Sequence, residues 1–151
     1  MEINRDFKEL LESLNSRSVE YLLVGAYALA FHGIPRNTGD MDIWVNPDPE
    51  NAERVVAALD DFGFGDLGLT VRDFTTPDMV VQLGVVPSRV DMLTSISGVA
   101  WPLAWQHRQE ARYGSVPIFF LGRDDFIDNK RSTGRPKDMG DIALLTESNG
   151  G

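Results

Sequence analysis

The chain of 151 residues fits a single domain, and its 42% hydrophobic and 25% charged residues are typical of a soluble globular protein. It has no cysteine, which excludes disulfides and thiolate metal sites, and its net charge of −9 argues against general binding of the nucleic-acid backbone. No apolar run approaches the ~20 residues of a membrane span and the N-terminus does not resemble a signal peptide, so we expect a cytoplasmic protein without membrane contact.

Hydrophobic periodicity predicts the first elements in chain order. The apolar side chains that recur at helical spacing near the N-terminus are Phe7, Leu10, Leu11 and Leu14. An apolar run over residues 21–24 then predicts a buried strand that ends at Gly25, and residues 26–31 predict a short helix. Residues 41–45 predict another strand, and the helix after it starts at Asp48, a residue type that caps helices.

The second half of the chain predicts two paired strands, a helix, a strand and two further helices. These elements span residues 80–83 and 89–93 (strands), 101–112 (helix), 116–121 (strand), and 124–132 and 136–147 (helices). We therefore expect one α+β domain over residues 1–147, in which helices pack on a small mixed β-sheet. Residues 148–151 are expected to form a flexible tail.

Three aspartates carry the strongest chemical signal. Asp40 and Asp42 are two residues apart at the start of a predicted strand, so their side chains point to the same face. Two neighbouring carboxylates repel each other unless a cation lies between them, and Mg²⁺ is a cation that prefers oxygen ligands. Asp91 lies in an apolar run where a charged side chain requires a partner. If its strand lies beside that of Asp42, three carboxylates converge, as a two-metal phosphoryl-transfer site requires.

A turn of two small residues precedes the aspartates. Gly25 and Ala26 lie where the predicted strand passes into a helix. Small residues allow the backbone to approach a phosphate, and the N–H groups at the start of a helix attract anions.

The order of these motifs resembles the nucleotidyltransferase superfamily, whose members share the polymerase-β-like fold. Its signature is an apolar strand ending in Gly-Gly or Gly-Ser, an Asp-x-Asp pair after a short helix, and a third aspartate on a later strand. The corresponding runs here are Leu23-Val24-Gly25-Ala26, Thr38-Gly39-Asp40-Met41-Asp42-Ile43-Trp44-Val45 and Val90-Asp91-Met92-Leu93. The resemblance extends over residues 21–145.

The chain is particularly similar to small bacterial nucleotidyltransferase-like proteins related to the AbiE-type toxins of toxin–antitoxin systems. Those relatives carry Arg-x-Thr before the aspartate pair, here Arg36-Asn37-Thr38. They often end with a Lys-x-x-x-x-Arg-x-Lys-Asp-x-x-Asp pattern, which matches Lys130, Arg135, Lys137, Asp138 and Asp141. The resemblance thus implies a protein partner within such a system.

The resemblance also implies a role for each matched residue. Asp40, Asp42 and Asp91 would bind two Mg²⁺ ions, or Mn²⁺, and Asp91 would also activate the attacking hydroxyl. The residues that would bind the nucleotide are Gly25, Ala26, Arg36, Thr38, Lys130 and Asp138. The expected enzyme moves a nucleoside monophosphate from an NTP, with ATP as the expected donor, to a hydroxyl of a protein, an RNA end or a small molecule.

Other interpretations remain open on the residues alone. Ala26 stands where the family has glycine or serine, which favours a non-catalytic partner or antitoxin protein with the same fold. A metal-dependent phosphodiesterase would use the same carboxylates. The segment 135–141 fits a salt-bridged helix start as well as it fits a nucleotide-binding motif.

Overall fold

The structure is a computed structural model that describes residues 3–34, 39–85 and 87–149. Its elements in chain order are α1 (Arg5–Ser16), β1 (Tyr21–Val24), α2 (Gly25–Phe31), β2 (Asp40–Val45), α3 (Pro49–Leu59), the short helical turns η1 (Asp60–Phe64) and η2 (Gly65–Leu67), α4 (Val71–Thr75), β3 (Val80–Leu83), β4 (Arg89–Leu93), α5 (Trp101–Gln106), β5 (Gln109–Tyr113), β6 (Val116–Phe120), α6 (Arg123–Thr133) and α7 (Pro136–Asn149). This mixture of helices and strands confirms the expected α+β class.

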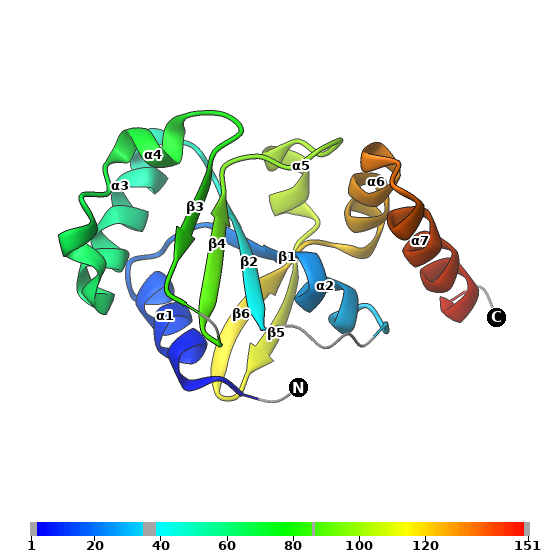
Figure 1. The fold of residues 1–151 in the computed structure, drawn as a ribbon, viewed down its shortest axis with the longest axis horizontal. Helices are drawn as coiled ribbons and strands as arrows, with labels where there is room; N and C mark the ends of the chain where they lie inside the picture. The colour runs from blue at the N-terminus through cyan, green and yellow to red at the C-terminus, as the bar shows by residue number, and fades with distance from the viewer. Residues whose placement is uncertain (1–2, 35–38, 86, 150–151) are drawn as a thin grey trace.

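The strands form one six-stranded sheet in the order β3-β4-β2-β1-β6-β5. The sheet is mixed, because β2 pairs with β4 and β1 with β6 in parallel, whereas the remaining neighbours are antiparallel. Helices α3 and α4 lie beyond one end of the sheet and the α6–α7 pair beyond the other (Figure 1). The predicted small mixed sheet with packed helices is confirmed.

Alternation along the two central strands separates the core from the opposite face. Met41 and Ile43 on β2 and Met92 on β4 are fully buried. Asp40 and Asp42, which alternate with Met41 and Ile43 along β2, are only partly buried. Farther along the same face of β2, Trp44 packs edge-on against Trp101 of α5, with ring centroids 4.9 Å apart. Helix α5 therefore covers the Trp44 end of this face. Asp40 and Asp42 lie towards the other end of the strand.

The first helix forms as expected. Asn4 caps it by accepting hydrogen bonds from the backbone N–H groups of Asp6 and Phe7. Its buried side chains are the predicted set Phe7, Leu10, Leu11 and Leu14. None of the helices in the described part of the chain has the length and apolarity that crossing a bilayer requires.

The helix predicted over 101–112 is wrong in its second half. The helix ends at Gln106, and Gln109–Tyr113 forms the edge strand β5, which pairs antiparallel with β6. Tyr113 lies opposite Val116, so the two strands are joined by a two-residue turn in which Gly114 has a φ of +61°. Glycine adopts this left-handed conformation without a steric cost. The hairpin therefore overrides the helical character of the residues before it.

The C-terminal helix is longer than its predicted span. Helix α7 continues to Asn149, so residues 148 and 149 of the expected tail are helical, and residues 150–151 lie outside the described part. Helix α4 was not expected at all. It begins with a capping box in which the side chains of Thr70 and Asp73 satisfy each other's backbone N–H groups.

Candidate active site

The register of the two central strands brings the aspartates together. In the parallel pair of β2 and β4, Asp42 lies directly opposite Asp91, and Asp40 lies opposite Arg89. All four side chains alternate with buried core residues and so share the face opposite Met41 and Val90. The expectation that the Asp91 strand lies beside the Asp42 strand is confirmed.

Electrostatics mark Asp42 as the central group of this cluster. Burial of its carboxyl, together with the negative charges of Asp91 and Asp40, raises the pKa of Asp42 to about 6. The positive charges of Arg89 and Lys130 oppose this rise. Lys130 comes from α6, so a helix late in the chain contributes charge to a site formed by two strands. A strongly shifted carboxyl in such a cluster is a signature of functional sites.

The backbone at Gly25 lies against the Asp42 carboxylate. Gly25 begins α2 with a φ of +64°, and a Cβ atom added there would lie 2.1 Å from Asp42 Oδ2. Glycine is therefore required for its conformation and for its lack of a side chain. The two motifs that the sequence treats separately, the small-residue turn and the aspartate pair, are in direct contact.

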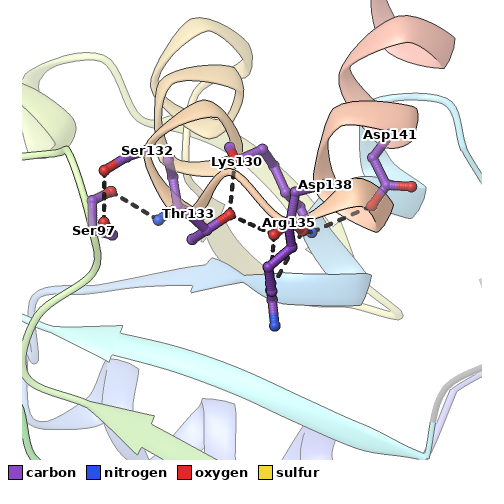
Figure 2. A network of polar contacts seen from close by, with 8 residues as sticks. Ser97, Lys130, Ser132, Thr133, Arg135, Asp138 and Asp141 are labelled. Carbon is purple, nitrogen blue, oxygen red and sulfur yellow. Dashed lines mark hydrogen bonds and ion pairs between the residues drawn. The ribbon is translucent and has the colours of Figure 1, made fainter.

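The side chain of Lys130 is held by two carboxylates of α7 (Figure 2). Its Nζ lies 3.1 Å from Asp138 Oδ1 and 3.4 Å from Asp141 Oδ2. The Lys130 side chain is only 14% exposed, so these contacts fix its direction more firmly than surface ion pairs do. The structure thus places a fixed ammonium group close enough to Asp42 to affect its titration.

Asp138 is the centre of the polar network in Figure 2. It is fully buried and accepts hydrogen bonds from Lys130, Thr133 and Arg135. These three donors outweigh the effect of burial and hold the pKa of Asp138 well below its usual range. Its described contacts are therefore those of a residue that joins α6 to α7 and directs Lys130.

Helix α6 also forms hydrogen bonds with the loop after β4. Ser97 and Ser132 hydroxyls lie 2.6 Å apart, and Asn129 Nδ2 donates to the Ser97 carbonyl at 2.9 Å. The Cβ of Ser132 would lie 2.5 Å from a Cβ added at Gly98, so this loop approaches α6 closely. Helix α6, which carries Lys130, is thus held by contacts with α7 and with the loop after β4.

The aspartates have the oxygen ligands that divalent metals prefer, but two of them contact protein partners in this structure. Over residues 3–34, 39–85 and 87–149, no three His, Cys, Asp or Glu side chains are gathered into a group that could hold a metal ion. Arg89 forms an ion pair with Asp40, and Gln82 donates to Asp91 at 3.1 Å. Carboxylate oxygens are nevertheless the kind of ligand that Mg²⁺ or Mn²⁺ prefers, and the three aspartates share one face of the sheet.

Solved structures share this arrangement of elements over nearly the whole chain. A candidate nucleotidyltransferase from Thermotoga maritima matches with a TM-score of 0.62 and 16% identity, over 95% of this chain and 92% of its own. The aminoglycoside nucleotidyltransferase ANT(2″)-Ia, solved with adenylyl-2″-tobramycin, matches with a TM-score of 0.56 and 13% identity, over 94% of this chain and 86% of its own. The chain has the nucleotidyltransferase fold. No family model and no curated protein matches it.

Within this nucleotidyltransferase fold, most of the predicted site residues converge. Five of them are associated with the central strands β2 and β4, either in these strands or by their effect on Asp42. They are Gly25, Asp40, Asp42, Asp91 and Lys130. Ala26 follows Gly25 in the first turn of α2. Arg36 and Thr38 lie outside the described residues, so their predicted contacts with a nucleotide stay predictions.

The sequence interpretation missed Arg89 and Gln82, which contact the aspartates. A signal for Arg89 was present, because it stands two residues before Asp91 in a predicted strand and must share its face. No comparable signal existed for Gln82, whose position opposite Asp91 depends on the pairing of β3 with β4.

Gly25→Ala is expected to destabilise the nucleotidyltransferase fold by about 2 to 3 kcal/mol, because the new methyl group adds a collision with Asp42 to the cost of a positive φ. Gly68→Ala is the matched control, since Gly68 has a φ of +70° and open space around it. That control should lose about 1 kcal/mol. Urea unfolding measures both changes, and equal losses would contradict the close approach to Asp42.

Asp42→Asn is expected to stabilise the metal-free protein at pH 7 by about 1 kcal/mol. The folded-state pKa of about 6 exceeds the ordinary value of 3.8, so the ionised carboxylate disfavours folding. This penalty is complete above about pH 6 and disappears as the pH falls towards 4. Urea unfolding in EDTA at pH 7 and at pH 4 should therefore show a gain only at the higher pH. A gain of equal size at both would contradict the raised pKa.

Proposed function

We propose that this protein is a divalent-metal-dependent nucleotidyltransferase that moves a nucleoside monophosphate from an NTP to a hydroxyl acceptor. The observation that carries this proposal is the facing pair Asp42 and Asp91 on adjacent parallel strands, with Asp40 on the same face. The fold shared with ANT(2″)-Ia, which was solved with an adenylylated product, supports a nucleotide donor and makes ATP the first candidate.

The carboxylates supply the metal ligands in this proposal. Asp40, Asp42 and Asp91 would hold two Mg²⁺ ions, or Mn²⁺, after Asp40 and Asp91 leave their present partners. Held by these residues, the metal would supply positive charge for the α-phosphate and for the leaving pyrophosphate. Burial and the negative charges of Asp91 and Asp40 raise the pKa of Asp42, and a nearby cation would offset the part that comes from these charges.

The other residues would bind the nucleotide and handle the proton. The backbone N–H groups of Gly25 and Ala26 would contact the triphosphate, and the fixed ammonium of Lys130 would neutralise part of its charge. The acceptor oxygen forms a bond to the α-phosphorus while the bond to pyrophosphate breaks. Asp91 would take the proton that the acceptor hydroxyl loses.

Two finer points depend on the sequence resemblance alone. They are the nucleotide contacts of Arg36 and Thr38 and the membership of a toxin–antitoxin system. The non-catalytic alternative has specific support, because Ala26 lacks a side-chain hydroxyl and the Asp40 carboxylate is already paired with Arg89. It predicts a stable complex with a partner protein and no turnover.

Labelled nucleotide distinguishes these functions. The protein is incubated with Mg²⁺, a cell lysate as the source of acceptor, and ATP labelled on either the α- or the γ-phosphate. Nucleotidyl transfer labels an acceptor from the α-phosphate only and releases pyrophosphate. Labelling from the γ-phosphate would indicate a kinase instead. No labelling with any of the four NTPs, together with no binding of Mg²⁺ or NTP at millimolar concentration, would refute the proposal.

A further inference from the structure

Arg89 is positioned as a counter-ion for the aspartates. It lies opposite Asp40 in the parallel pairing of β2 and β4, and its guanidinium forms an ion pair with the Asp40 carboxylate. The two side chains are 35% and 32% exposed, so the pair is partly withdrawn from solvent. Asp40 is therefore neutralised by a residue of the neighbouring strand.

The local charge balance makes this contact more than a surface ion pair. Strands β2 and β4 carry three aspartates and a single basic residue, Arg89, on the shared face. A site that binds divalent cations through these aspartates needs positive charge when no cation is bound. Arg89 supplies that charge.

Arg89 has hydrogen-bond donors beyond those that its contact with Asp40 uses. Its Nε is buried and has no hydrogen-bond partner among the described residues, although the guanidinium is bound to Asp40 at Nη2. A guanidinium carries five N–H donors in a rigid fork that matches phosphate oxygens. The present contact with Asp40 leaves this capacity partly unused.

We propose that Arg89 is an internal substitute for the metal: it occupies the cation position on Asp40, leaves when a divalent cation binds, and then turns to the triphosphate. This inference rests on the proposed function, because it concerns the same carboxylates. It has two consequences. The protein without nucleotide binds divalent cations weakly, since each must displace Arg89. Nucleotide and metal strengthen each other's binding, because the triphosphate provides a new partner for the guanidinium.

Removal of Arg89 tests the competition directly. Mn²⁺ binding to the metal-free protein without nucleotide is followed by the electron paramagnetic resonance signal of free Mn²⁺. We expect Arg89→Gln to bind Mn²⁺ at least threefold more tightly than the natural chain. Arg112→Gln on the edge strand β5 removes the same unit of charge away from the aspartates and should leave the affinity within twofold. Unchanged or weaker Mn²⁺ binding by Arg89→Gln would overturn the inference.

The pairing with Asp40 is tested by a double-mutant cycle. In an Asp40→Asn background, Arg89→Gln should no longer tighten Mn²⁺ binding, because the carboxylate for which the two cations compete has been removed. Equal tightening in both backgrounds would show a general charge effect and contradict the substitution model. Melting curves of each variant confirm that the fold is retained.

The natural chain provides a measurement that does not depend on a variant's folding. The Arg89 Nε–H resonance, assigned by its absence in Arg89→Gln, should shift when Mg²⁺ is added and shift again when a non-hydrolysable NTP follows. An unchanged resonance at saturating Mg²⁺ would refute the displacement. If the protein transfers label in the assay above but Arg89 neither moves nor competes, this inference alone fails. If neither the natural chain nor Arg89→Gln binds Mn²⁺, the proposed function fails with it.

Discussion

Asp42→Asn is expected to lower the kcat/KM of nucleotidyl transfer by about 10³-fold or more while the fold is retained. Asp42 lies opposite Asp91, and its carboxylate occupies the space that a side chain on Gly25 would need. Its pKa is also raised. An asparagine keeps the shape of the side chain but provides only one weak oxygen ligand. The loss should therefore appear in turnover, whereas the melting temperature should not fall. The measurement is transfer of α-phosphate label, with Mn²⁺ binding as a second readout.

Asp66→Asn is the matched control for that experiment. Asp66 is an exposed aspartate in η2, so the substitution removes the same charge away from the sheet face that carries the site. It should leave transfer unchanged within about twofold. If Asp42→Asn retained full activity, the carboxylates would not be the metal ligands, and the proposed mechanism would be wrong even if transfer itself occurs.

Asp138→Asn is expected to lower the free energy of unfolding at pH 7 by about 3 kcal/mol and to reduce transfer as well. Asp138 is fully buried and accepts hydrogen bonds from Lys130, Thr133 and Arg135. The amide NH₂ group of asparagine would face hydrogen-bond donors and could not accept from them. The Lys130 ammonium would also lose a negative charge that balances its own. Lys130 would then lose the contact that directs it, so both stability and the electrostatics at Asp42 should change.

The effect of Asp138→Asn on the free energy of unfolding is expected to depend on pH. The pKa of Asp138 is lowered in the folded chain, so its contribution to stability is complete above the unfolded pKa of about 4 and is lost as the pH falls towards the folded value. The difference between the natural chain and Asp138→Asn should therefore shrink between about pH 4 and pH 2. Asp128→Asn on α6 is the control, because the Asp128 side chain is 59% exposed and lies 3.9 Å from its partner Arg131. Urea unfolding across pH measures both, and a constant difference would contradict the role of the Asp138 charge.

The segment that the sequence misjudged shows where local patterns fail. Residues 109–112 have helical character, yet they form strand β5 because their backbone groups pair with β6 across the turn at Gly114. Strand pairing is a non-local interaction, and propensity is a weak prior wherever such pairing is available. The dipeptide Gly114-Ser115 between two apolar residues was the local signal for the hairpin.

The carboxyl-terminal motif shows a different limit. Its lysine, arginine and aspartates fitted a nucleotide-binding motif and a salt-bridged helix start equally well from the sequence. The structure shows that the ion pairs exist, because Asp138 and Asp141 both contact Lys130. The positive charge of Lys130 also lowers the pKa of Asp42, although the two residues are far apart in the sequence. The two interpretations are therefore compatible, because the ion pairs hold a lysine whose charge acts on Asp42.

The residue types of the candidate site and their spacing can be read from the sequence. Period-two geometry places Asp40 and Asp42 on one face of a strand whatever surrounds it, and the small residues Gly25 and Ala26 mark a backbone that another group can approach. Which groups contact these aspartates depends on how the strands pair in three dimensions. Strand β4 lies parallel beside β2, so Asp91 faces Asp42 and Arg89 pairs with Asp40. Such register depends on the packing of the whole sheet, because a shift by one residue would turn each of these side chains to the core.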